Sequence, residues 1–248
     1  MAVRKSSIGQ SFMATAAYHK TQRRYHYPMI KAIIFDVDGT LLDTERIYIK
    51  TWKEAGTLFG YEITDDIMLR TRAINRQMAI AVFQEALGKE FDYDLVRKER
   101  IRLSEECIHA MTPEELLLPH VAETLKALAD QNLPMAVASS SSYRETVDHL
   151  DHVNLLSYFK AVVGGDMVTK GKPNPDIFLK AAELMGVPAA DCLVVGDTPA
   201  DVLAAHGAGM PMILIPDLVA VTEQTRALSS RILPSMEELP QVIASLCK

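Results

Sequence analysis

The hydrophobic positions along this chain follow two different periods, and their order predicts the fold. Short runs of consecutive apolar residues, typical of strands buried on both faces of a sheet, alternate with segments whose apolar residues recur every three or four positions, typical of amphipathic helices. The predicted strands cover residues 30–35, 134–139, 161–163, 192–197 and 211–215, and the helices between the later strands cover 121–129, 143–150, 176–185 and 200–205. This alternation predicts an α/β fold with a doubly wound parallel sheet.

Between the first strand and the alternating half, the pattern is helical throughout. The predicted helices there cover residues 47–59, 65–87 and 92–111. Consecutive helices without an intervening strand predict a separate bundle, which we expect over residues 45–112. The core then consists of residues 30–44 and 113–248. Residues 1–29 have no sustained apolar period and are expected to be a disordered extension.

Composition and charge narrow the function classes. The chain has 248 residues and a net charge of −6, and residues 1–29 carry five basic residues and no acid, which leaves −11 on the rest. A body this acidic argues against a nucleic-acid surface, and no segment is apolar for the roughly 18 residues that a membrane span needs. The cysteines, Cys107, Cys192 and Cys247, have no metal-ligand spacing. We therefore expect reduced thiols and a cytoplasmic protein.

The first predicted strand ends on two acids, Asp36 and Asp38. Carboxylates crowded at the end of a buried strand are costly unless a cation compensates them. Gly39 can adopt a positive φ, and Thr40 adds a hydroxyl, so the turn is suited to wrapping backbone N–H groups around an anion. The stretch predicts a divalent metal with oxygen ligands.

Residues 35–45, Phe-Asp-Val-Asp-Gly-Thr-Leu-Leu-Asp-Thr-Glu, resemble the first motif of the haloacid dehalogenase-like phosphohydrolase superfamily, in its phosphatase and β-phosphoglucomutase-like branch. The resemblance implies a Rossmann-like core with a helical cap that closes over the site. It also implies that Asp36 is a nucleophile that forms an aspartyl-phosphate and that Asp38 is a general acid and base. That division fits the chemistry, because covalent catalysis splits a difficult displacement into two easier ones.

Three later stretches resemble the remaining family motifs. At the end of the second core strand, the resemblance assigns phosphate binding to the hydroxyl of Ser139 and to the amide that follows, that of Ser140. Serines 140–142 are also typical of a turn or of a helix N-cap. Lys172, in Gly-Lys-Pro-Asn-Pro-Asp-Ile-Phe, would stabilise charge on the transferring phosphoryl oxygens.

The last motif is Val-Gly-Asp-Thr-Pro-Ala-Asp at residues 195–201. In the family, Asp197 is a metal ligand, and with Asp36 and the backbone carbonyl of Asp38 it would bind Mg²⁺ through hard oxygen ligands. Asp201 resembles a supporting acid that orients the lysine or a metal-bound water. Either aspartate can also cap the helix that follows.

The helical insertion offers weaker signals. Tyr48 and Trp52 lie one helical turn apart, and we expect Tyr48 to face the site and Trp52 to pack between helices. Arg72 and Arg76 are candidates for contact with the leaving group, although arginines are more commonly exposed to solvent.

These motifs together predict a Mg²⁺-dependent phosphatase that acts on a small phosphorylated metabolite, sugar-like or nucleoside-like, as a monomer or weak dimer. A β-phosphoglucomutase-like mutase is the alternative, but that branch has a histidine where this chain has Tyr48 and a lysine where it has Ser142. A dehalogenase is disfavoured, because a halide needs no proton from Asp38. A non-catalytic protein that binds a phosphorylated ligand is a third possibility, because fold does not fix function.

Overall fold

In the computed structural model, which describes residues 29–72, 74 and 76–246, the strands of the core form one parallel sheet. The strands are β1 (Ala32–Phe35), β2 (Met135–Ala138), β3 (Ala161–Val163), β4 (Cys192–Gly196), β5 (Met212–Leu214) and β6 (Arg231–Ile232). Their order across the sheet is β3-β2-β1-β4-β5-β6, with every neighbouring pair parallel. The predicted extension over residues 1–29 lies almost wholly outside the described residues.

Strand β1 lies inside the sheet, and the connections diverge on its two sides. The sheet continues through β2 to β3 on one side and through β4 and β5 to β6 on the other. Phe35 is level with Val137 of β2 and with Val195 of β4. The residues that follow these strands therefore emerge side by side, at the point where open α/β sheets bind their ligands.

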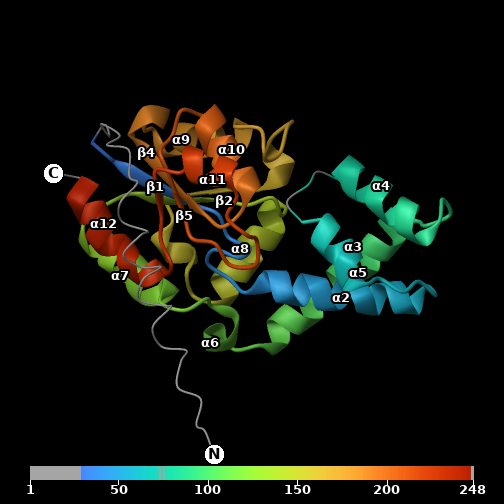
Figure 1. The fold of residues 1–248 in the computed structure, drawn as a ribbon. Helices are drawn as coiled ribbons and strands as arrows, with labels where there is room; N and C mark the ends of the chain where they lie inside the picture. The colour runs from blue at the N-terminus through green and yellow to red at the C-terminus, as the bar shows by residue number, and fades with distance from the viewer. Residues whose placement is uncertain (1–28, 73, 75, 247–248) are drawn as a thin grey trace, which may run out of the picture.

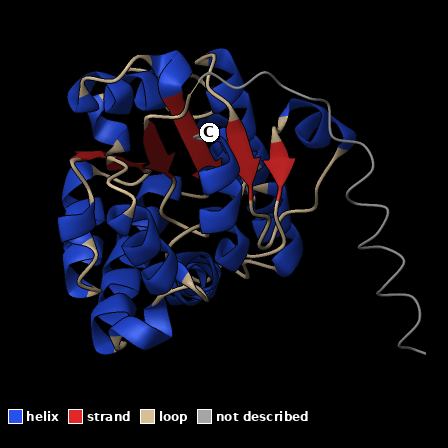
Figure 2. Ribbon diagram, turned by 90° about the vertical axis from the view of Figure 1, so that its left-hand side faces the viewer, coloured by secondary structure: helices blue, strands red, loops and turns tan. Residues whose placement is uncertain are grey.

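Helices cover both faces of the sheet (Figure 2). They are α7 (Val121–Asp130), α8 (Tyr143–His152), α9 (Asp176–Met185), α10 (Pro199–Gly207), α11 (Glu223–Leu228) and α12 (Leu239–Leu246), with one-turn 3₁₀ helices η1 (Leu156–Tyr158), η2 (Gly165–Met167), η3 (Ala189–Asp191) and η4 (Met236–Glu238) in the connections. Ile33 and Phe35 pack in the apolar cluster under α7 and α12, whereas Ile34 packs in the cluster under α9 and α10. Because side chains alternate along a strand, an unbroken apolar run fills both layers, as the sequence predicts.

A helical bundle follows β1 and lies beside the sheet (Figure 1). It consists of α2 (Thr44–Leu58), α3 (Asp65–Arg70), α4 (Arg76–Leu87) and α5 (Tyr93–Ala110), and the short helix α6 (Pro113–Leu116) leads back to the core. The bundle has its own apolar cluster, in which the Trp52 ring lies 4.8 Å from that of Phe83 and 5.3 Å from that of Tyr93. The predicted packing of Trp52 between helices is thus correct. The boundaries of this cap at residues 45 and 112 stay a prediction.

One predicted helix is wrong. Residues 65–87 were expected to form a single helix, but α3 ends at Arg70 and α4 begins at Arg76. The Thr71 hydroxyl donates to the carbonyl oxygens of Ile67 at 2.9 Å and Met68 at 3.1 Å. Such local side-chain bonds compete with the continuing helical ladder, and apolar periodicity does not register them.

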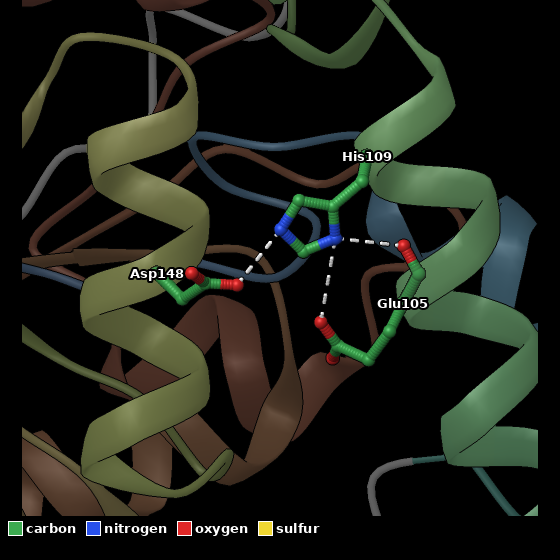
Figure 3. A group of neighbouring side chains, drawn as sticks. All are labelled: Glu105, His109 and Asp148. Carbon is green, nitrogen blue, oxygen red and sulfur yellow. Dashed lines mark hydrogen bonds and ion pairs between the residues drawn. The ribbon is translucent and has the colours of Figure 1, made fainter.

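Histidine and acid side chains join α5 of the cap to α8 of the core (Figure 3). His109 has its Nδ1 2.8 Å from the carbonyl oxygen of Glu105 and its Nε2 3.0 Å from Oδ2 of Asp148. Both ring nitrogens face oxygen acceptors, so both contacts are hydrogen bonds only when the ring carries two protons. Beside them, the buried His149 of α8 lies with Nε2 3.1 Å from Oε1 of Glu105. A protonated His149 therefore adds an ion pair with Glu105 between α8 and α5.

The stability of this contact is expected to depend on pH through His149. Burial alone would lower the pKa of His149, but the hydrogen bond and charge of Glu105, with the charges of Asp38 and Asp148, raise it above the ordinary value of 6.5. A raised folded-state pKa gives stability that is complete below the unfolded-state pKa and is lost as the pH rises through the folded-state pKa. In urea unfolding, the free energy of unfolding of the wild type should therefore exceed that of His149→Gln most near pH 6. This difference should fall by up to about 1 kcal/mol towards pH 9.

His206→Gln is the control for this comparison, because His206 is exposed at the end of α10. The difference in the free energy of unfolding between wild type and His206→Gln should vary less with pH than the difference between wild type and His149→Gln. A His149→Gln difference that stays constant from pH 6 to pH 9 would contradict the proposed protonation.

Candidate active site

The predicted site residues come together at the carboxyl edge of the sheet. Asp36 directly follows β1, Ser139 follows β2 and Asp197 follows β4. Asp201 lies in the first turn of α10, and Lys172 lies in the loop before α9. Residues from four distant segments are therefore neighbours, because parallel strands end at a common edge.

Three buried acids and one lysine form the centre of this group. Carboxylate oxygens of Asp36, Asp197 and Asp201 lie within 4.8 Å of one another, and these residues are 6%, 3% and 1% exposed. The Lys172 ammonium lies 2.5 Å from Oδ1 of Asp36 and 2.7 Å from Oδ1 of Asp201. The lysine thus joins the strand-end acid to the helix acid.

The electrostatics of this group show an excess of negative charge. Burial raises the pKa of Asp36 to about 8; the charge of Lys172 opposes this, while those of Asp201 and Asp38 add to it. Burial, with the charges of Asp201 and Asp36, also raises the pKa of Asp197 well above its usual range. The pKa of Lys172 rises because the charges of Asp201 and Asp36 outweigh its burial. Three acids and one cation in so small a volume fit a divalent metal ion that oxygen ligands would bind.

The turn after β1 brings its backbone against Asp197. Gly39 has a φ of +82°, and a Cβ atom at this position would lie 2.6 Å from Oδ2 of Asp197. Thr40 donates a hydrogen bond from its hydroxyl to Oδ1 of Asp197 at 3.0 Å. Glycine is therefore required here for two reasons, the left-handed backbone and the close approach of a carboxylate.

Gly39→Ala is expected to reduce both stability and activity. A side chain in the left-handed region costs about 1–2 kcal/mol, and the added methyl group must also displace Asp197. Misplacing a site group by about 1 Å can lower kcat by about 10²-fold. Urea unfolding and steady-state kinetics with an aryl phosphate would measure both effects.

Gly60→Ala provides a matched control for the backbone effect. Gly60 has a similar φ of +79°, but nothing lies within 4 Å of its added Cβ. This variant should lose comparable backbone stability and keep its activity. Equal losses of activity in the two variants would rule out a specific effect on Asp197.

Hydroxyl groups surround the second acid of the motif, Asp38. Its Oδ1 accepts hydrogen bonds from Thr44 at 2.6 Å and from Tyr48 at 3.0 Å. Its Oδ2 accepts from Ser139 at 3.0 Å and from Ser141 at 3.1 Å. These contacts fix the carboxylate, and because hydroxyls can rotate, one of them can instead accept a hydrogen bond from Asp38 in its protonated form.

The serines at residues 139–142 have partners that differ from one to the next. The Ser139 hydroxyl, a predicted phosphate ligand, donates to Asp38, while Ser140 lines the adjacent cavity. Ser141, grouped in the sequence with the turn and capping serines, also donates to Asp38, and Ser142 is the residue that caps α8. The contact of Thr44 was missed, although Thr44 is the next-to-last residue of the first motif.

Asp201 caps a helix and also contacts the lysine of the site. Its Oδ2 accepts hydrogen bonds from the backbone N–H and the hydroxyl of Thr198, which completes a capping box at the start of α10. Its Oδ1 faces Lys172. This capping box fixes the carboxylate of Asp201 beside Lys172. Asp197 does not cap this helix, because Thr198 is the N-cap residue.

A cavity of about 960 Å³ lies between this centre and the helical cap. Tyr48, Arg72 and Arg76, the predicted cap residues, all line it. Arg72 donates from Nη1 to the carbonyl oxygen of Leu218 at 2.9 Å, and Arg76 is ion-paired with Asp94 of its own bundle. Both arginines therefore already have partners within the protein.

The cavity wall also contains acids that were not predicted, Glu45, Glu105 and Glu145. Glu45, at the start of α2, has its pKa raised to about 7 by burial and by the charge of Asp38, against the charges of Arg72 and Arg100. The sequence signal was its position as the last residue of the first motif. Its charge adds to the negative field around the acids.

Fold and site together define an α/β enzyme with an acidic centre beneath a helical cap. The family described as haloacid dehalogenase-like hydrolase matches residues 33–215, so the chain belongs to this family. It is 31% identical over 186 residues to the phosphorylated carbohydrates phosphatase of Thermotoga maritima, covering 74% of this chain and 84% of that protein. It is also 32% identical over 186 residues to the beta-phosphoglucomutase of Bacillus subtilis, covering 73% of this chain and 81% of that protein.

The solved structures agree on the architecture. The beta-phosphoglucomutase of Clostridium difficile has a TM-score of 0.74 with this chain at 21% identity, over 88% of this chain and 97% of that one. This likeness confirms the predicted doubly wound core with an inserted helical cap. The chain is therefore classed as an enzyme among the phosphoric monoester hydrolases of the family.

Proposed function

We propose that this protein is a Mg²⁺-dependent phosphatase that hydrolyses a small phosphomonoester through an aspartyl-phosphate on Asp36. The observation that carries the proposal is the contact of Lys172 with both Asp36 and Asp201 at the floor of a large cavity. One carboxylate there is paired with a cation that can also reach phosphoryl oxygens, and a separate acid, Asp38, is fixed by hydroxyls. These are the groups that two-step phosphoryl transfer needs.

In the first step, a carboxylate oxygen of Asp36 forms a bond to phosphorus while the bond from phosphorus to the leaving oxygen breaks. Asp38 gives its proton to that oxygen, so the product leaves as an alcohol. In the second step, Asp38 takes a proton from water, the water oxygen bonds to phosphorus, and Asp36 is released. Lys172 stabilises the phosphoryl oxygens throughout, in a position fixed by Asp201.

The carboxylates of Asp36 and Asp197, with the backbone carbonyl of Asp38, would hold the Mg²⁺ ion. The ion would supply positive charge that offsets both the buried acids and the phosphoryl oxygens. Support comes from the three buried acids, whose charge one lysine does not balance. The cap would exclude water and select the leaving group.

The substrate we propose is a small phosphorylated metabolite, sugar-like or nucleoside-like. The cavity of about 960 Å³ is in the size range of small-molecule sites. The similarity to a phosphorylated carbohydrates phosphatase and to a probable pseudouridine-5'-phosphatase of Drosophila melanogaster supports these two classes.

Mg²⁺ removal tests the proposal directly. We expect the wild type to release phosphate from 4-nitrophenyl phosphate with Mg²⁺ present and to lose this activity with EDTA, with recovery on adding Mg²⁺. Activity that EDTA leaves unchanged would contradict the metal site. Absence of turnover, together with thermal stabilisation by inorganic phosphate, would indicate a protein that only binds phosphorylated ligands.

A hexose phosphate mutase is the second candidate, favoured by the similarity to a beta-phosphoglucomutase. It requires that the aspartyl-phosphate passes its phosphoryl group to a sugar phosphate rather than to water. Incubation with β-glucose 1-phosphate separates the two functions. A mutase yields glucose 6-phosphate when a bisphosphate primer is added, whereas a phosphatase yields glucose and phosphate with or without the primer.

A further inference from the structure

The cavity wall contains a guanidinium group that has no ion-pair partner among the residues the structure describes. This group belongs to Arg100 on α5, and its Nε atom is buried without a hydrogen-bond partner. It stacks over the ring of Tyr48, 4.6 Å from the centroid, and lies 5.7 Å from the centroid of the Trp52 ring. The two aromatic rings hold the guanidinium in a defined place.

Of the two arginines that the sequence suggested, Arg72 also has a buried Nε without a hydrogen-bond partner, but its Nη1 donates to a backbone carbonyl of the core, and Arg76 is ion-paired with Asp94. Burial lowers the pKa of Arg100 below its usual range, and the like charge of Arg97, one turn earlier on α5, adds to this effect. A partly buried cation beside a second cation is costly unless an anion compensates it. The charge of Glu145 acts in the opposite direction on this pKa, but no carboxylate of the described residues forms an ion pair with Arg100.

The position of Arg100 indicates which part of the substrate it meets. Tyr48, on which it stacks, donates from its hydroxyl to Oδ1 of Asp38 at 3.0 Å. Asp38 is the acid that protonates the leaving oxygen in the proposed mechanism. The same cavity contains Arg100, Asp38 and Lys172, with the lysine on the core side and Arg100 on the cap side. A group bound to Arg100 is thus attached to the leaving group and not to the transferred phosphoryl group.

We infer that Arg100 is a specificity-determining residue that binds a second anionic oxygen group, a carboxylate or a phosphate, on the leaving group of the substrate. A guanidinium fork pairs such a group through two parallel hydrogen bonds. The inference rests on the proposed phosphatase function and narrows its substrates to phosphomonoesters with a second negative charge.

Matched substrates that differ only in this charge test the inference. One pair is 2-phosphoglycolate and ethyl phosphate, which differ by a carboxylate in place of a methyl group. A longer pair is 6-phosphogluconate and glucitol 6-phosphate, which differ by a carboxylate in place of a hydroxymethyl group. We expect wild type to have a higher kcat/KM for the anionic member of at least one pair.

Arg100→Met should remove this preference. A hydrogen bond to a charged group corresponds to a loss of about 10-fold to 100-fold in kcat/KM for the anionic substrate, mostly through KM. For the uncharged member of each pair, kcat/KM should change less than about threefold, because this substrate makes no hydrogen bond to Arg100 that the variant could lose. Arg100→Lys keeps the charge without the fork, so it should fall between wild type and Arg100→Met, and it serves as the test if Arg100→Met does not fold.

Arg102→Met is the matched control, since Arg102 lies on the same helix but is exposed and paired with Glu99 and Glu106. It should leave the charge preference unchanged. The inference is wrong if wild type prefers neither anionic substrate, or if Arg100→Met lowers kcat/KM equally for both members of a pair. Failure to hydrolyse 4-nitrophenyl phosphate would instead refute the proposed function itself.

Discussion

Asp36→Asn is expected to lower kcat by at least about 10⁴-fold, because the amide cannot attack phosphorus and no covalent intermediate forms. The amide keeps the shape of the side chain, so the loss reports on chemistry and not on packing. In wild type, brief reaction with 4-nitrophenyl phosphate followed by acid quenching should leave phosphate attached to the protein. Mass spectrometry of the quenched Asp36→Asn protein should show no such adduct.

Asp191→Asn is a suitable control for this experiment. Asp191 precedes β4 at the opposite edge of the sheet and pairs with Lys31 at 2.8 Å. Its replacement also removes a carboxylate but should leave kcat near that of wild type.

Without metal, Asp36→Asn should be at least as stable as wild type to heat, since it removes one of three crowded buried acids. Full activity of Asp36→Asn would refute the proposed nucleophile.

Asp38→Asn is expected to have an effect that depends on the leaving group. The amide cannot donate the proton that an alcohol needs to depart, and general acid catalysis contributes about 10² to 10⁴-fold. With an alkyl phosphate, both the first step and turnover should fall by about this factor. The nitrophenol of 4-nitrophenyl phosphate leaves without a proton, so the first step should persist.

Rapid-mixing kinetics can separate these steps. With 4-nitrophenyl phosphate, Asp38→Asn should release a stoichiometric burst of nitrophenol and then turn over slowly, because no base activates the water that attacks the aspartyl-phosphate. Ser235 does not line the cavity, and its hydroxyl accepts a hydrogen bond from the backbone N–H of Glu237, so Ser235→Ala should behave as wild type. Equal losses with alkyl and aryl substrates and no burst would contradict the acid and base role of Asp38.

Much of the fold followed from the sequence where the apolar pattern was long and unbroken. The first strand, predicted at 30–35, is observed at Ala32–Phe35, and the helix predicted at 176–185 has these limits in the structure. The two-residue strand β6 and helices α11 and α12 were not predicted. The first is too short for any periodic pattern, and α11 has only six residues. The eight-residue α12 lies at the end of the chain, where apolar residues were not assigned to an element.

The candidate site was predictable on its core side and much less so on its cap side. Asp36, Lys172 and Asp197 lie at strand ends or in the loops that follow, and the topology brings such positions together. On α5, Arg97, Arg100 and Arg102 all lie within six residues of one strongly charged helix. Sequence alone does not show which of them faces a cavity, because that depends on how the helix packs against α2.

The sequence by itself determined the class of fold and the chemistry that the strand ends can perform, because hydrophobic period and residue type are local properties of the chain. The tertiary structure decided the partners of each group. It assigned Ser139 and Ser141 to Asp38 and gave Asp201 to both Lys172 and the start of α10. Within the described part of the chain it left Arg100 without an ion-pair partner. Contacts of this kind join residues from separate segments, so they exist only once the chain has folded.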